Sequence, residues 1–180
     1  MLAAARAAYD SPGRFYHTWD HVLDCLEKLR GFADADGAAF LALLFHDAVY
    51  VAGRDDNEAK SAALARRTLE PHLPPRELAD VERMILATQH HALESDDDPR
   101  VAVVLDVDLS ILGAPWPQYR AYADGVRREY AMPPERFDAA RAAFLSKLLQ
   151  APAIFHTAEG RARWEAAARE NVARELRQLG

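Results

Sequence analysis

Residues 37–50 of the chain read GAAFLALLFHDAVY. From residue 38 to residue 45 this run is apolar on every face of a helix, which indicates a helix buried at the centre of a domain. Its end carries His46 and Asp47, two adjacent polar side chains. Burying both without partners would cost several kcal/mol. We therefore expect other groups in the fold to satisfy them.

Helical patterns continue along the chain on both sides of this run. Proline and glycine fall between the periodic segments, and no alternating β-pattern stands out. The connections are short, and none resembles an interdomain linker. We predict an all-α helical bundle in which residues 1–180 form one domain, with an exposed acidic loop at 95–98. The predicted helices span 19–32, 37–50, 57–70, 77–91, 99–112, 117–130, 134–149 and 159–179, with a shorter one at 2–9.

The composition limits the class of partner. The formal net charge is −6, so we expect no stable binding to nucleic acid and none to an anionic membrane surface. Cys25 is the single cysteine, which excludes an intrachain disulfide. No run approaches the roughly 20 apolar residues of a membrane span, and no signal peptide is recognisable. A cytoplasmic location is the expectation.

Four histidines lie where helical patterns place them near the core. His17 and His21 are four residues apart, which puts them on one face of a helix or of its entry turn. His90 and His91 end a segment whose apolar stripe falls at positions 81, 84, 85 and 88. The same helical phase brings His91, rather than His90, to the inner face.

The segment VAVVLDVDLSILG, residues 101–113, contains two aspartates. Its apolar stripe follows positions 101, 104, 105, 108, 111 and 112, so Asp108 interrupts the stripe and Asp106 falls on the flank. A carboxylate on a buried stripe requires a cation or several donors. We predict Asp108 as a metal ligand and Asp106 as a neighbour that orients a ligand or faces solvent.

Imidazole and carboxylate groups together suit a divalent metal ion. Helical bundles assemble such sites from side chains on facing helices. The identity of the ion is not fixed by these residues, and Mn, Mg, Co, Fe, Zn and Ni all remain candidates.

The order His21, His46-Asp47, Asp108 resembles the H…HD…D pattern of the HD-domain superfamily of metal-dependent phosphohydrolases. The resemblance extends over nearly the whole chain from Arg14 onward. It implies an all-α core of the HD-domain type, with a divalent ion held by His21, His46, Asp47 and Asp108. The segments that carry it are RFYHTWDH, LLFHDAVY, RDDNEAKSA, ILATQHH, LDVDLSILG, YRAYADGVRREYA and ARENVARELRQL.

This resemblance implies hydrolysis of a phosphate ester of a nucleotide or another small phosphorylated metabolite. A divalent ion activates water and polarises the phosphoryl group. Asp47 is expected to orient the water, and Glu58 to protonate the leaving group or anchor a water. Asp20 and Asp106 are candidates to orient the histidine rings. The predicted substrate-binding residues are Arg14, His17, Arg54, Lys60 and His91.

Two other functions remain open at this point. The HD scaffold also hosts di-iron oxygenases, and His91 with His17 or His90 would supply the added ligands. The second alternative is a metal-stabilised module that binds a nucleotide or a partner protein without turnover. A homodimer is expected only because such dimers are common.

Overall fold

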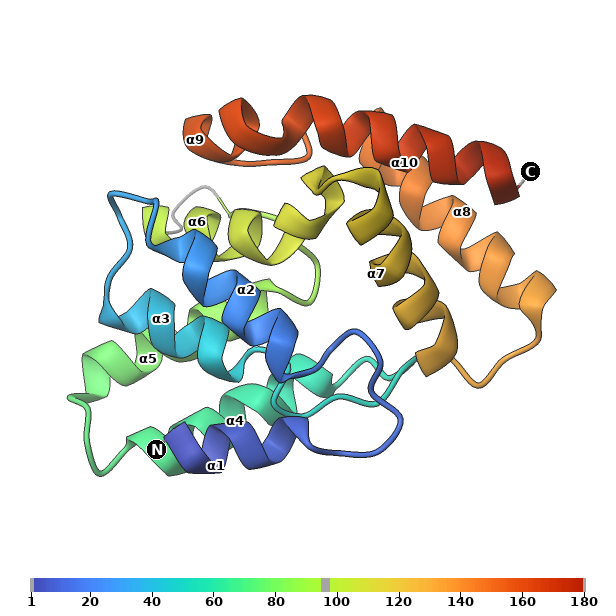
Figure 1. The fold of residues 1–180 in the computed structure, drawn as a ribbon. Helices are drawn as coiled ribbons and strands as arrows, with labels where there is room; N and C mark the ends of the chain where they lie inside the picture. Colours follow the sequence, from blue (N-terminus) through green and yellow to red (C-terminus); the bar gives the residue numbers. More distant parts are fainter. Residues whose placement is uncertain (1, 95–97, 180) are drawn as a thin grey trace.

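The structure, a computed structural model, describes residues 2–94 and 98–179. Every regular element in these ranges is helical, which confirms the predicted all-α fold. Figure 1 shows them packed as one compact bundle of helices joined by short connections. The elements are α1 (Leu2–Tyr9), α2 (Trp19–Leu29), α3 (Gly37–Phe45), α4 (Asn57–Leu69), α5 (Pro75–Ala87), α6 (Pro99–Asp108), η1 (Leu109–Gly113), α7 (Trp116–Glu129), α8 (Pro134–Gln150), α9 (Ala158–Gly160), η2 (Arg161–Glu165) and α10 (Ala166–Leu179).

Helix α3 occupies the centre of the N-terminal half, in contact with α2, α4, α5 and α6. It begins where the Asp36 carboxylate accepts the N–H of Ala39, at 2.9 Å, a normal N-terminal cap. Most of its side chains are buried, as the apolar run predicted. The helix ends at Phe45, earlier than the predicted residue 50. His46 and Asp47 therefore lie in the turn that follows it.

The hydrophobic core forms two clusters. One is built by α1 to α6, and the other by η1, α7, α8 and α10. Trp164 packs against both clusters. Helix α10 lies along α8 and η1 and runs past the end of α7 in Figure 1. The two halves meet where α6 passes into η1, and the candidate metal centre lies at this junction.

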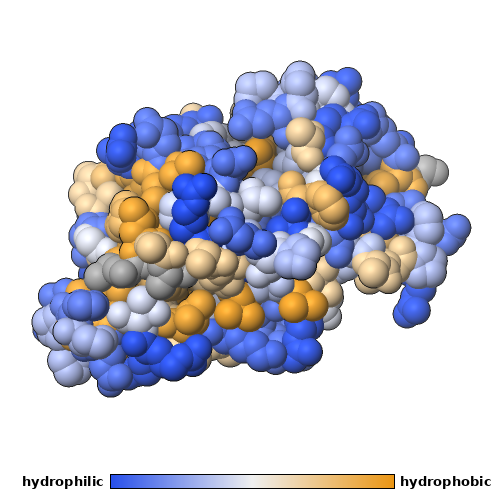
Figure 2. Space-filling model, turned by 60° about the horizontal axis from the view of Figure 1, so that its bottom comes forward, coloured by the Kyte–Doolittle hydropathy of each residue, from blue (hydrophilic) through white to orange (hydrophobic). Residues whose placement is uncertain are grey.

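The surface is mixed in character. Hydrophilic residues cover most of the face in Figure 2, with apolar residues interspersed among them. No helix in the described ranges is both long and apolar enough to cross a membrane. Of the predicted acidic loop, residues 95–97 lie outside the described residues, whereas Asp98 caps α6 by accepting the N–H of Arg100 at 2.9 Å.

Candidate metal centre

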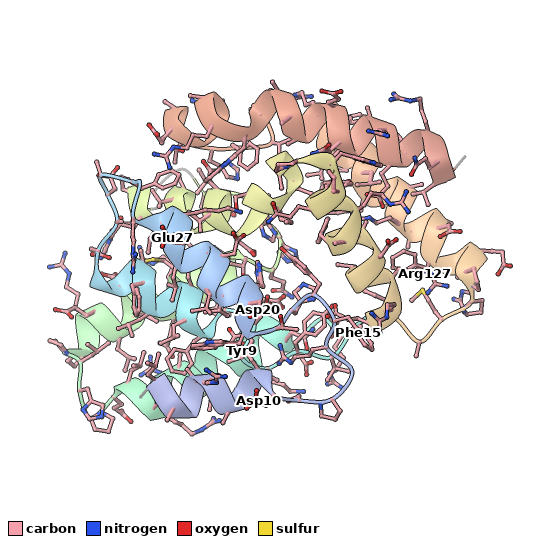
Figure 3. All side chains as sticks on the ribbon, viewed as in Figure 1. Tyr9, Asp10, Phe15, Asp20, Glu27 and Arg127 are labelled. Atoms are coloured by element: carbon pink, nitrogen blue, oxygen red, sulfur yellow. The ribbon has the colours of Figure 1, made fainter. Side chains whose placement is uncertain are left out.

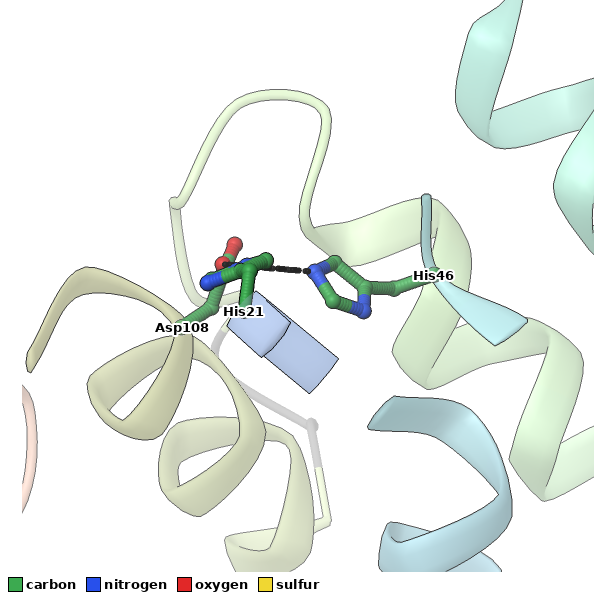
Figure 4. Close-up of side chains that lie close together, drawn as sticks. All are labelled: His21, His46 and Asp108. Carbon is green, nitrogen blue, oxygen red and sulfur yellow. Dashed lines mark hydrogen bonds and ion pairs between the residues drawn. The ribbon is translucent and has the colours of Figure 1, made fainter. Parts of the chain in front are cut away.

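Three side chains from separate parts of the chain converge beside the junction of the two core clusters (Figure 4). His21 comes from α2, His46 from the end of α3, and Asp108 from the last turn of α6. Each offers one ligand atom, and the three atoms lie within 4.8 Å of one another. His21 Nε2 is 3.2 Å from His46 Nε2 and 3.1 Å from Asp108 Oδ1. Two imidazoles and a carboxylate in this arrangement are a suitable set for a divalent transition metal.

Asp47 adds a second carboxylate to this group. Its Oδ2 is 3.0 Å from His46 Nε2 and 3.7 Å from His21 Nε2. His46 donates from Nδ1 to the carbonyl of Leu43, at 2.8 Å, which fixes its tautomer and leaves Nε2 free to bind an ion. All four predicted ligands are thus close together.

The charges of the group stabilise one another. Burial alone would lower the pKa of His46, but Asp47 and Asp108 outweigh it and raise that pKa well above its usual value. Burial would raise the pKa of both aspartates, and the neighbouring histidines lower it instead. A divalent ion would replace the imidazolium proton as the balancing charge, so the residues fit a bound metal.

His91 contacts the same aspartate from the other side. Its Nε2 lies 2.9 Å from Asp108 Oδ2, whereas His90 is exposed. His91 thus faces inward as predicted, but helix α5 ends at Ala87, so the helical phase used in the prediction does not extend that far. His91 has a φ of 49°, in the left-handed region that a non-glycine residue rarely adopts. Such strain is typical of functional positions.

Asp106 departs from the prediction. It is fully buried, and its carboxylate accepts the N–H groups of His156 and Thr157 at 2.6 and 2.8 Å and the Thr157 hydroxyl at 2.6 Å. It thus faces neither solvent nor the histidine ligands. Helix α6 is buried on nearly every side, so a single apolar stripe could not describe it. Asp20, also proposed to orient a histidine, is exposed.

His156 supports His91. Its Nε2 donates to the carbonyl of His91 at 3.1 Å, while its own N–H is held by Asp106. These contacts connect Asp106, through His156, to His91, which contacts Asp108. Nothing in the sequence spacing signals them, because His156 and His91 are 65 residues apart.

His17 is fixed by a residue that sequence reasoning missed, Glu129 at the end of α7. Glu129 Oε2 is 2.6 Å from His17 Nδ1, and Oε1 accepts the N–H groups of residues 15, 16 and 17 at 2.7 to 3.0 Å. Figure 3 shows Phe15 beside this end of α7. Burial would lower the pKa of His17, but Asp47 and Glu129 raise it. The His17 ring also stacks on Tyr50, with centroids 4.0 Å apart.

The three cations predicted to bind phosphate are absent from the described lining of the cavity beside Asp108. The Arg14 guanidinium donates to the carbonyls of His17, Asp47 and Ala48 at 2.8 to 3.0 Å. It therefore holds the two site loops together instead of facing a ligand. Arg54 and Lys60 are exposed and pair with Asp56. Arg54 lies in the turn before α4 and Lys60 on the exposed side of its first turn.

A cavity of about 380 Å³ opens beside Asp108, within the range of roughly 300–1,000 Å³ usual for small-molecule sites. Three predicted site residues besides Asp108 line it: His17, Glu58 and His91. The remaining wall comes mainly from α7, α8 and the turns beside them, and its core residues belong to the cluster built by η1, α7, α8 and α10. Its other lining residues are Tyr16, Tyr50, Thr88, Gln89, Leu109, Ile111, Tyr122, Val126, Tyr130, Met132, Phe137, Ala140, Arg141 and Phe144.

Comparisons with protein-family models, with curated proteins and with solved structures give no match to this chain. Membership of the HD-domain superfamily therefore stays a prediction from the sequence motifs. The evidence for the candidate metal centre is the arrangement of its side chains.

Proposed function

We propose that the protein is a metal-dependent phosphohydrolase. The observation that carries this proposal is the convergence of His21, His46 and Asp108 within 4.8 Å, with Asp47 Oδ2 against both imidazoles, at the edge of a cavity of small-molecule size. A divalent ion held there would act as a Lewis acid on the phosphoryl group and activate water. A phosphate group also supplies the negative charge that such a centre favours.

In the proposed reaction, a water oxygen bonds to phosphorus while the bond from phosphorus to the alcohol oxygen breaks. Asp47 orients the water and accepts its proton. His17, whose Nδ1 is engaged by Glu129, has Nε2 available to give a proton to the departing oxygen. Glu58 lines the same cavity and is the other candidate donor. The products are the alcohol and inorganic phosphate.

Metal content and hydrolysis measured on the same samples test the proposal. The wild-type protein, Asp108→Asn and His46→Ala are assayed with 4-nitrophenyl phosphate and Mn²⁺, Co²⁺, Mg²⁺ or Zn²⁺. We expect about one ion per wild-type chain and hydrolysis that falls at least ~100-fold in both variants, because the charge-stabilising ion is lost. Asp124→Asn, at an exposed position of α7, is the matched control and should behave as wild type.

Other outcomes would overturn the proposal in defined ways. A bound ion without turnover of any phosphate ester would favour the non-catalytic module. Two irons per chain with oxygen consumption would favour a di-iron oxygenase, in which His91 beside the second oxygen of Asp108 would be the added ligand. Absence of any metal after reconstitution would contradict both enzyme readings.

A further inference from the structure

The cavity has two chemically different parts. One part holds the ionisable lining residues, which are Asp108 of the metal centre, His91 in contact with it, His17 and Glu58. The other part is walled by apolar and aromatic side chains. A line of ring contacts leads into it, from His21 to Tyr16 at 4.7 Å between centroids and on to Tyr122 at 4.6 Å. The apolar wall consists of Tyr122, Val126, Tyr130, Met132, Phe137 and Phe144.

Two polar side chains that line the cavity beside this wall, Thr88 and Gln89, are already engaged by the protein. Thr88 Oγ1 donates to the carbonyl of Ile85, and Gln89 Nε2 donates to that of Asp55, both at 2.7 Å. Recognition of a nucleobase edge needs free donors and acceptors in fixed positions. The aromatic side chains of the apolar wall, by contrast, line the cavity and present apolar surface to it. This wall suits the face of an uncharged ring better than the edge of a base.

Arg141 is the one lysine or arginine among the described lining residues. Its Nε and Nη2 donate to Glu175 at 2.9 and 3.0 Å, and its Nη1 donates to the Tyr122 hydroxyl at 3.0 Å. Glu175 thereby balances its charge inside the protein. A second or third phosphate would meet no free lysine or arginine among the described lining residues, which include the carboxylate of Glu58. The charges therefore favour a single phosphate.

We infer that the substrate is a phosphate monoester whose alcohol carries an uncharged aromatic ring. This inference rests on the proposed function and narrows it. The phosphate lies at the metal centre, and the ring packs between the aromatic side chains of α7 and α8. Aromatic pairs of this kind add stabilisation beyond the area they bury.

Substrate preference in the Mn²⁺-loaded protein tests the inference. The value of kcat/KM is measured for 2-naphthyl phosphate, glycerol 2-phosphate, AMP and ATP. We expect 2-naphthyl phosphate to exceed glycerol 2-phosphate by at least about tenfold, since ring packing is worth roughly this factor. AMP should rank below the naphthyl ester, and ATP should be hydrolysed least.

Two phenylalanines provide a matched pair of variants. Phe144 lines the cavity and Phe40 lies outside it on α3, and each is 40% exposed. Phe144→Ala should reduce the preference for naphthyl over glycerol phosphate several-fold, and Phe40→Ala should keep the wild-type ratio. Equal rates for the two esters, or a preference for ATP, would overturn the inference.

Binding without hydrolysis separates this inference from the proposed function. Calorimetry compares naphthylmethylphosphonate with methylphosphonate, neither of which has a cleavable ester. Tighter binding of the naphthyl compound that weakens in Phe144→Ala supports the ring site even if no ester is hydrolysed, in which case only the proposed function fails. Equal binding of the two phosphonates would contradict the ring site whatever the activity.

Discussion

Glu129 illustrates how one carboxylate can order both a loop and a reactive ring. Its side chain has no exposed surface and accepts three backbone N–H groups besides the His17 ring. Burial would raise the pKa of Glu129, but these hydrogen bonds and the charge of His17 lower it from 4.5 to about 2. The ionised carboxylate is therefore favoured in the folded state. The contribution of this ionised carboxylate to the free energy of unfolding can be measured.

The variant Glu129→Gln is predicted to lose stability in a pH-dependent way. A depressed pKa contributes stability that is complete above the unfolded-state value of 4.5 and declines as the pH falls towards 2. At pH 7 we expect a loss of up to about 3 kcal/mol, from 1.36 kcal/mol per pKa unit. Urea unfolding at pH 7 and pH 3 measures the difference, which should shrink at the lower pH. A loss independent of pH would contradict this, and Glu135→Gln, at an exposed position, is the control.

At the scale of elements, α6 is the helix on which the site depends. Its last residue is the metal-binding candidate Asp108, while Asp106 two residues earlier accepts the N–H groups of His156 and Thr157 just before α9. Gly160 packs directly on that carboxylate, and a Cβ there would overlap Asp106 Oδ2 and approach Thr157 Oγ1 to 3.1 Å. The short helix α9 is thereby tied to α6.

The variant Gly160→Ala should therefore destabilise the protein. We expect a loss of roughly 1–3 kcal/mol, because the added methyl group displaces a buried and fully hydrogen-bonded carboxylate. Gly37→Ala is the matched control, since a Cβ at that helical position has no atom within 4 Å. Thermal unfolding of the two variants measures the difference. If both unfold at the wild-type temperature, the packing of α9 on Asp106 is not as described.

At the scale of the whole molecule, the metal centre would join segments far apart in the chain. His21 and Asp108 are 87 residues apart, and His46 comes from a third element. An unfolded chain cannot present such a site, so an ion that binds there stabilises only the folded state. The same ion would also hold α2, the end of α3 and α6 together.

Adding a divalent ion that binds at this centre is thus predicted to raise the melting temperature of the protein. At a free concentration 100 times Kd the stabilisation is about 2.7 kcal/mol, which corresponds to roughly 5–10 °C for a domain of this size. A chelator should reverse the shift. Differential scanning calorimetry checks the effect, with Asp108→Asn expected to show little shift and Asp124→Asn the full one. An equal shift in both variants would place the ion elsewhere.

The sequence by itself determined the helical class, most helix positions and the buried central helix that precedes His46 and Asp47. These features follow from local properties: apolar residues on all faces mark a central helix, and proline and glycine end helices wherever they occur. The four ligands that the resemblance implied lie together in the structure, where buried polar side chains satisfy one another.

Tertiary structure alone decided how the other side chains are used. Arg14 was expected to bind phosphate but is engaged by carbonyls from two loops. His91 reaches Asp108 through a left-handed turn, and Glu129 meets His17 across 112 residues of sequence. A helical pattern predicts the direction of a side chain only within the helix. It does not specify which distant backbone groups that side chain will contact. Those partners are set by the packing of the whole chain, which local sequence cannot report.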